Sequence, residues 1–413
     1  MEKNLKRSAF EKIPDWLKRK GDESKVFFLD LRGAAVDWEN DKVRTRIAGI
    51  LKELQSQAFS SSLNEPAVIK VHIGEPLIKT AIIPEIAESS LEFLKRKGVN
   101  RAVFGDTTVL YSSPRGGKEN PHGAENPYRN LAEKKGWTRK APFVVLDRPA
   151  TSVKDILEFS EGAITIEAGP PGRYANIFAA GALSATGCLI QHAHMTGHML
   201  TGLACCVKGI AMGLANRRGK AQMHLSLRPV ISEERCEMCG ACAEKCPESA
   251  LNFEPREIPQ LTDERCVGCG QCLAVCEAKA IEMKGLDNYS NYDWSRGADT
   301  IHNRMTDYAV AIMQKLWNSS LHIAHLVRMT ANCDCYNKDQ IPVCDDIGFL
   351  VGRNPFAVDK CATDLIIERM SRYADEDMNR KISAIRRGDP WAYAHATYHI
   401  ESEAKLEIVP FNR

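Results

Sequence analysis

Two copies of one cysteine motif constrain this chain more than any other feature. Residues 236–246 and 266–276 both have the spacing C-x2-C-x2-C-x3-C. Three thiolates on a tight loop can bind three corners of a cubane iron–sulfur cluster, and the fourth cysteine, one helical turn later, points at the other cluster. Zinc ribbons use paired C-x2-C knuckles instead. The repeat therefore predicts two 4Fe–4S clusters that carry single electrons.

The crossed spacing also predicts which cysteines share a cluster. Gly240 and Gly270 stand within the two motifs and would let the backbone approach a cluster closely. The expected ligand sets are Cys236, Cys239, Cys242 and Cys276 for cluster 1, and Cys266, Cys269, Cys272 and Cys246 for cluster 2.

Composition narrows the class of protein around these motifs. The chain has 413 residues, of which 44% are hydrophobic and 26% charged, and its formal net charge is +2. So small a charge excess predicts neither nucleic-acid nor membrane-surface binding. The first 25 residues are charged and have no apolar signal region, so we expect a cytoplasmic protein. Thiols stay reduced there, and metal binding explains the 15 cysteines better than disulfides do.

Apolar runs alternate with helical periodicity along the first half of the chain. This alternation is typical of an α/β fold, with a mostly parallel sheet flanked by helices. The expected strands are 25–31, 67–73, 101–107, 143–147, 163–167 and 187–192, and the expected helices include 42–59 and 82–97.

The cysteine-rich block interrupts this pattern, because helical periodicity returns after it. The expected division is a helical leader (1–24), a first α/β part (25–230), an inserted small α+β ferredoxin-like domain (231–285), and a second α/β part with a C-terminal tail (286–413). The segment 111–130 is rich in Pro, Gly and Asn and follows a strand end, so it is a candidate substrate lid.

Polar side chains near the strand ends predict a catalytic site. Lys70 and His72 alternate on one strand and therefore share a face. Charged residues in a covered strand are costly unless they meet a ligand or a partner. The candidate site residues are Lys70, His72, Asp106, Tyr111, His194, His198 and Lys208. The alternatives to a catalytic site are purely structural: a buried Lys–Asp pair, hydrogen-bonded histidines in the core, and solvated lysines.

A second group of thiols lies near the C-terminal third of the chain. Cys333, Cys335 and Cys344 have the spacing C-x-C-x8-C and suit zinc or another metal that prefers soft ligands. A histidine such as His194 or His198 would be the fourth ligand. A redox-active pair and uncommitted thiols are the alternatives.

Outside the cysteine repeat, the chain resembles the domain of unknown function 362 family, whose members are often labelled iron–sulfur centre proteins. The resemblance rests on KVHIGE (70–75), GDTTVLY (105–111), residues 194–224, CDC (333–335) and residues 345–366. The resemblance implies the α/β architecture with an inserted bacterial-type ferredoxin module. It also implies a redox function, but it names no substrate. Cys205 and Cys206 stand where small residues are common in the family.

Together these features predict an iron–sulfur oxidoreductase of the anaerobic type. Its two clusters would pass electrons between an external carrier, such as a ferredoxin or partner enzyme, and a small-molecule site in the α/β domain. An electron-transfer subunit and a metal- or sulfur-handling maturation factor are the alternatives. The sequence has no Walker loop and no GxSxG motif. Flavin sites often lack motifs, so a flavin stays open as a cofactor.

Overall fold

The computed structural model describes residues 25–116, 125–150, 156–169, 171–224, 227–285, 298–373, 376–388 and 390–411. The expected leader (1–24) and residues 117–124 of the expected lid lie outside this part of the chain. Within it, no helix is both long and apolar enough to cross a membrane.

A sheet of eight strands runs through the protein in the order β16-β1-β15-β14-β7-β2-β3-β4. Strand β15 is antiparallel to both of its neighbours, and the other pairings are parallel. The predicted α/β class with a mostly parallel sheet is therefore confirmed. The strands are β1 (Lys25–Asp30), β2 (Ala67–Lys70), β3 (Ala102–Asp106), β4 (Phe143–Val145), β7 (Cys188–His194), β14 (Ser320–Leu326), β15 (Gly348–Gly352) and β16 (Lys405–Pro410).

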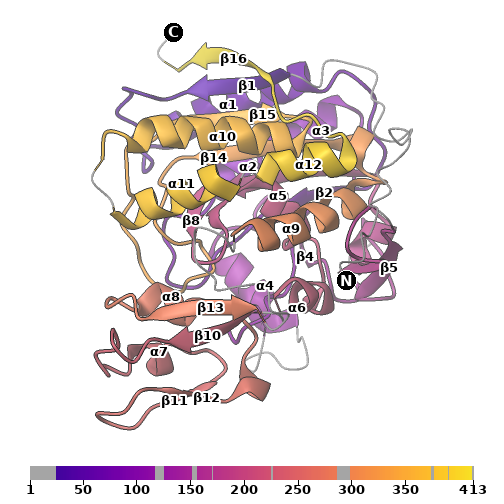
Figure 1. Cartoon of the computed structure of the whole chain (residues 1–413). Helices are drawn as coiled ribbons and strands as arrows, with labels where there is room; N and C mark the ends of the chain where they lie inside the picture. The colour runs from indigo at the N-terminus through magenta and orange to yellow at the C-terminus, as the bar shows by residue number, and fades with distance from the viewer. Residues whose placement is uncertain are drawn as a thin grey trace.

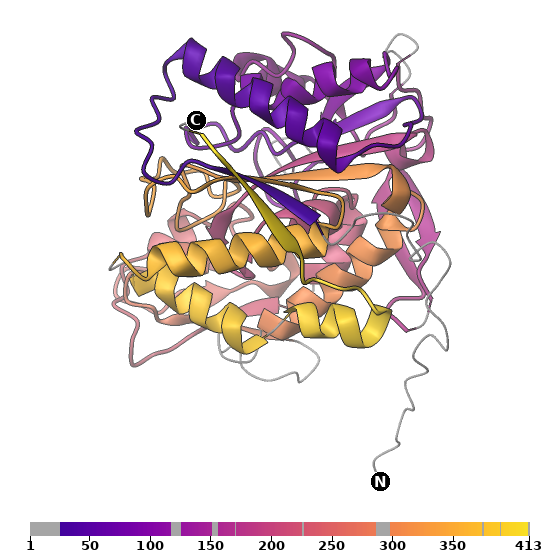
Figure 2. The same cartoon turned by 90° about the horizontal axis from the view of Figure 1, so that it is seen from above.

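Helices cover both faces of the sheet, as Figure 2 shows from above. Successive strand residues point to opposite faces, so Ile69 packs in one hydrophobic core and Val68 in another. The first face is covered by α1 (Asp41–Ala58), α2 (Pro84–Ala87), α3 (Ser89–Arg96) and α4 (Glu125–Lys134). Over the other face lie α5 (Cys206–Ala211), α6 (Arg217–His224), α9 (Ala298–Met313), α10 (Pro355–Met370), α11 (Glu376–Gly388) and α12 (Pro390–Tyr398).

Three expected elements differ from the structure. Strand β5 (Ala163–Glu167) pairs with β6 (Asn176–Ala180) in a separate hairpin, and its side chains are only partly buried. The expected helix 82–97 is divided into α2 and α3. The C-terminal stretch is no surface tail, because β16 pairs with β1 and extends the main sheet at its open edge.

The cysteine-rich segment, residues 227–285, forms a small unit beside the main body (Figure 1). Strands β10 (Leu227–Ile231) and β13 (Ile281–Gly285) pair at its base, and β11 (Leu251–Asn252) pairs with β12 (Gln260–Leu261). Each motif ends in a short helix, α7 (Ala241–Glu244) or α8 (Gln271–Val275). The thirty-residue repeat is also a repeat of backbone shape, with positive φ at Met238 and Gly268, at Gly240 and Gly270, and at Ser249 and Lys279.

The cysteine-rich segment docks on the α/β body through the second copy of its motif. The short hairpin of β8 (Thr196–His198) and β9 (Gly202–Ala204) follows β7. Its turn packs against Gly270 so closely that a Cβ there would lie 2.8 Å from Leu200 Cδ2 and 3.1 Å from Met199 Cγ. A second contact comes from the end of the first copy, where Ser112 Oγ of the body donates to Glu248 Oε1 at 3.0 Å. The segment is therefore packed directly against the body.

This packing predicts a specific sensitivity at Gly270. Gly270→Ala and Gly98→Ala both place a Cβ at positive φ, which costs about 1–2 kcal/mol. Only Gly270→Ala also meets Leu200 and Met199, since a Cβ on Gly98 has no atom within 4 Å. Guanidinium denaturation should therefore show that Gly270→Ala loses roughly 1–3 kcal/mol more of the free energy of unfolding than Gly98→Ala does. Equal losses in the two variants would contradict this docking geometry.

Candidate functional site

A cavity opens on the α5 side of the sheet, where β2, β3 and β7 reach their carboxyl ends. Lys70 ends β2, Asp106 ends β3 and His194 ends β7. The parallel strands bring these three residues to one edge, and the cavity that they line holds about 100 Å³. Of the candidate site residues, the structure places these at the cavity wall: Lys70, His72, Asp106, His194 and Lys208.

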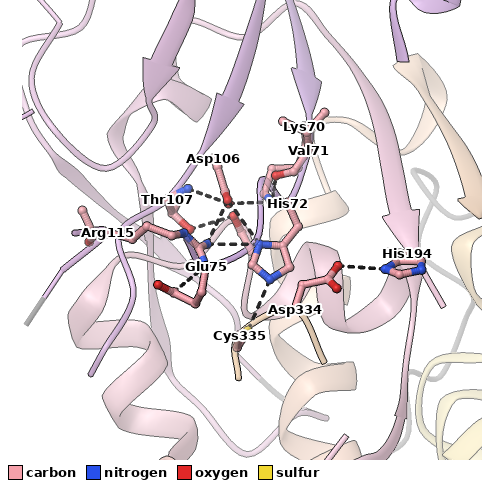
Figure 3. Close-up of polar contacts among 12 residues, drawn as sticks. Lys70, Val71, His72, Glu75, Asp106, Thr107, Arg115, His194, Asp334 and Cys335 are labelled. Carbon is pink, nitrogen blue, oxygen red and sulfur yellow. Dashed lines mark hydrogen bonds and ion pairs between the residues drawn. The ribbon is translucent and has the colours of Figure 1, made fainter. Parts of the chain in front are cut away.

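The Asp106 carboxylate is the centre of the polar network at this edge (Figure 3). It accepts from Lys70 Nζ at 3.0 Å and from Arg115 Nη2 at 2.9 Å. Burial opposes its charge, but Lys70 and Arg115 outweigh burial and hold the pKa of Asp106 well below its usual range. Burial also lowers the pKa of Lys70. The carboxylate is therefore ionised at neutral pH between two cationic side chains.

Arg115 joins this network to a second buried carboxylate. Its Nη1 donates to Glu75 Oε1 at 3.0 Å, and Tyr111 donates to the same oxygen at 2.8 Å. Glu75 is fully buried, and its Oε2 has no hydrogen-bond partner among the described residues. Sequence reasoning missed Glu75, although it ends the KVHIGE segment. Gly74, at φ +70°, turns the chain after the strand and lets Glu75 reach back to Arg115.

His72 links Asp106 to a cysteine. Its Nδ1 lies 3.4 Å from Asp106 Oδ2, and its Nε2 lies 3.3 Å from Cys335 Sγ. Burial and Arg115 oppose protonation of the ring, but Cys335 and Asp106 outweigh them and raise the pKa of His72. A hydrogen bond from Cys333 is the main cause that lowers the pKa of the Cys335 thiol well below its usual value, and Lys208 and His72 add to it.

Lys208 faces this pair of cysteines from helix α5. Its ammonium has no hydrogen bond to another described residue, and Cys335, Cys333 and Asp334 raise its pKa against the effect of burial. Asp334 is buried with one oxygen bonded to His194 Nδ1 at 2.8 Å, while its Oδ1 has no partner in the described chain. A cation and a carboxylate oxygen thus remain available to a ligand.

Lys220 forms the far wall of the cavity. It donates to Thr107 Oγ1 at 2.9 Å, and burial lowers its pKa to about 8. Four cationic side chains therefore line the cavity, together with two carboxylates; these residues are Lys70, Arg115, Lys208, Lys220, Asp106 and Asp334. The excess of positive charge favours an anionic ligand.

Two candidate residues lie nearby with other partners. Tyr111 is bonded to Glu75 and lines the neighbouring groove, not the cavity. His198 accepts from the backbone N–H groups of Leu200 and Thr201, both at 3.1 Å, and so holds the β8–β9 turn. Burial, and then Lys208, keep the pKa of His198 well below its usual value.

The structure does not bring the three C-terminal thiols together. Cys333 packs in the core that extends to α9, whereas Cys344 packs in the separate core beneath α10. Within the described chain, three metal-ligating atoms lie within 4.8 Å of one another only at Cys205, Cys206 and Asp359. There Asp359 accepts from the backbone N–H groups of Cys206 and Val207, so it serves as the cap of α5.

The mutual influence of the thiols shows which cysteines of the repeat lie near one another. After burial, the thiols that raise the pKa of Cys272 most are Cys269, Cys266 and Cys246. For Cys242, the neighbouring thiols that raise the pKa are Cys276 and Cys239. Cys246 thus lies with the second motif and Cys276 with the first, which matches the crossed pattern of the expected ligand sets.

The backbone around each crossed cysteine is suited to a cluster ligand. Cys246 Sγ accepts from Ala250 N, and Cys276 Sγ accepts from Ala280 N, both at 3.2 Å. Hydrogen bonds to the sulfur ligands are a regular feature of iron–sulfur sites. The residues present therefore fit two 4Fe–4S clusters.

The fold and site define a class of α/β protein with a cationic, thiol-lined cavity at the carboxyl ends of its strands. Comparison with known proteins identifies the family. Residues 67–364 match the family described as "Domain of unknown function (DUF362)", and the chain belongs to that family.

Other comparisons add little to this assignment. Nothing among curated proteins matches the chain. Among solved structures, the lactate racemase apoprotein from Thermoanaerobacterium thermosaccharolyticum is similar, with 10% identity and a TM-score of 0.25. The similarity covers 55% of this chain and 46% of the racemase chain, so this chain spans less than half of that protein's length.

The buried network predicts that Arg115 stabilises the fold. Arg115→Met would leave Glu75 and Asp106 without their shared cation in a site that is 0–3% exposed. We expect a loss of about 3–5 kcal/mol in the free energy of unfolding. The control is Arg139→Met, because the Arg139 side chain is 60% exposed and its partner Glu85 is half-buried; this loss should be about 0–1 kcal/mol. Similar guanidinium denaturation curves for the two variants would contradict this role.

Proposed function

We propose that this protein is an iron–sulfur oxidoreductase whose reaction takes place in the cavity at the carboxyl ends of β2, β3 and β7. Residues 231–285 would form its inserted two-cluster module, with the ligand sets given above. When bound, 4Fe–4S clusters supply one-electron transfer at low potential. An external one-electron carrier would exchange electrons with this module, and the substrate would be a small anion.

The observation that carries the proposal is the position of the cysteine-rich segment beside the residues of the cavity, with Cys246 of the first motif, an expected ligand of cluster 2, on the facing side. Cys246 lines a groove whose opposite wall includes Glu75, Tyr111 and Tyr336. Glu75 is bonded to Arg115, and Tyr336 follows Cys335, so this wall adjoins two residues that line the cavity. On another side, Gly270 packs against the β8–β9 turn. Electron tunnelling falls steeply with distance, so the packing of the segment against the body supports electron transfer to the cavity.

The residues of the cavity are suited to binding and proton transfer. Lys208 can bind an anionic group, because its ammonium is not bonded to another described residue. Asp334 Oδ1 can accept from a hydroxyl or ammonium of the ligand. His72, held between Asp106 and Cys335, can give or take a proton at Nε2. The same three groups would have no role in a protein that only carries electrons.

The metal content tests the module. Protein purified without oxygen should contain about eight iron and eight sulfide ions per chain. Cys246→Ala should remove the cluster of the second motif and Cys276→Ala that of the first, each leaving about four iron ions. Cys188→Ala, a buried thiol in β7, should keep the full content. Zinc in place of iron would overturn the module, and loss of the same cluster in both cysteine variants would overturn the crossed ligand sets.

A second measurement separates an enzyme from a carrier. Oxidation of reduced methyl viologen would be followed anaerobically with a panel of small anionic acceptors. We expect an active acceptor to lose about tenfold or more of its rate in Lys208→Met, because the anion contact is lost. Lys360→Met changes a partly exposed lysine that is paired with Asp364 on α10, and it should keep the rate. If the rate is unchanged in Lys208→Met, the reaction does not take place in this cavity.

A further inference from the structure

We propose that Cys333 and Cys335 form a reversible dithiol–disulfide pair in the cavity, with Cys335 as the attacking thiolate and a small anionic disulfide as the substrate. The inference deepens the proposed function by naming the reacting atoms and the class of substrate. It rests on the placement of one thiol pair against one imidazole and one ammonium.

Cys335 stands in the arrangement of an activated nucleophile. Its Sγ lies 3.3 Å from His72 Nε2, while the other ring nitrogen, Nδ1, lies 3.4 Å from Asp106 Oδ2 and 3.1 Å from Arg115 Nη2, so that this ion pair orients the ring. A nucleophile, a base and a carboxylate that orients the base are the recurring parts of such sites. Figure 3 shows that Cys335 reaches His72 from the loop after β14, while His72 follows the end of β2 by two residues and Asp106 ends the adjacent strand β3. The imidazole is therefore fixed by the sheet.

Cys333 supplies the second thiol. It lies two residues before Cys335, is 2% exposed, and lines the same cavity. Burial raises the pKa of the Cys333 thiol, and the neighbouring Cys335 adds to that rise, whereas Cys333 lowers the pKa of Cys335. One sulfur is thus suited to attack, and its buried neighbour is suited to resolve a mixed disulfide.

The cavity also selects the class of electrophile. Adjacent thiols react with a disulfide in two exchange steps and need no hydrogen-bond donors for an oxyanion. Lys208 faces both sulfurs, and the cations of the cavity outnumber its carboxylates, so the preferred disulfide carries carboxylates. Only the sulfur-bearing end of the substrate needs to enter a space of about 100 Å³.

The exchange is balanced in atoms and electrons. Cys335 thiolate attacks one sulfur of R–S–S–R′, forms the Cys335–S–S–R bond, and releases R′S⁻, which takes the proton of His72. Cys333 then loses its proton to His72 and attacks Cys335 Sγ, which forms the Cys333–Cys335 disulfide and releases RS⁻, protonated by the same ring. The substrate gains two electrons and two protons, and the pair loses them. An external one-electron reductant returns two electrons, and solvent returns two protons.

Peptide mass spectrometry tests the inference on the whole, anaerobically purified protein. Trypsin releases residues 329–338, which contain Cys333 and Cys335 as their sole cysteines, and residues 361–369, which contain Cys361 alone. Cys361 is the matched reference, because it is partly exposed like Cys335 and burial raises its pKa to about 11. The protein is treated with cystine, and free thiols are then alkylated.

We expect residues 329–338 to lose two hydrogens and escape alkylation, while Cys361 is alkylated in full. In Cys333→Ser the half-cystine adduct should remain on Cys335. His72→Gln should slow the oxidation about tenfold or more, because the thiolate loses its partner. Full alkylation of residues 329–338, equal oxidation of Cys361, or an unchanged rate in His72→Gln would each overturn the inference.

Iron analysis of the same samples separates this inference from the proposed function. Full iron content with an unreactive thiol pair would overturn the dithiol chemistry and leave the two-cluster module standing. A Cys333–Cys335 disulfide in protein that binds no iron would support the dithiol chemistry and overturn the two-cluster module. Reductive titration gives a further check, since the oxidised holoprotein should take up about four electrons per chain, and Cys335→Ser about two.

Discussion

The buried negative charge of Asp106 is the constraint on which the cavity depends. A carboxylate that is 2% exposed at the end of a covered strand needs nearby cations and donors. Lys70 from the adjacent strand and Arg115 from the following loop meet that need, and the backbone N–H of Thr107 adds a third donor at 2.8 Å. The same carboxylate also faces the His72 ring. The position of His72, and through it the surroundings of Cys335, therefore follows from one buried charge.

Much of the fold and part of the site could be predicted from the sequence, because both depend on local patterns. Apolar runs place the strands of the parallel sheet, and its carboxyl edge gathers Lys70, Asp106 and His194 without knowledge of any contact. Prediction is poorer where a tertiary contact decides the outcome. The β16 strand joins the sheet because β1 has a free edge, and the eight residues between Cys335 and Cys344 lead into a different core. Spacing along the chain could not show either result.

The cysteine repeat shows the same limit at a larger scale. Its thirty-residue period predicts two equivalent halves, and the positive φ angles recur at that period in the structure. The halves differ in what they face. A Cβ on Gly240 would meet Phe253 of the same segment, whereas one on Gly270 would meet Leu200 of the α/β body. Gly270 and the β8–β9 turn thus contribute to the orientation of the segment, and neither has a signature in the spacing of the cysteines.

Charge couples the proposed thiol chemistry to anion binding. Lys208 and His72 face the Cys335 sulfur, and a thiolate there offsets part of their positive charge. Formation of a Cys333–Cys335 disulfide removes that negative charge, while Lys70, Arg115 and Lys208 remain in place. An anion beside Lys208 is then bound more tightly by the oxidised pair than by the reduced pair. By linkage, the anion stabilises the disulfide by the same factor. Reduction of the pair therefore weakens the hold on an anionic product, which favours its release as the site returns to its reactive state.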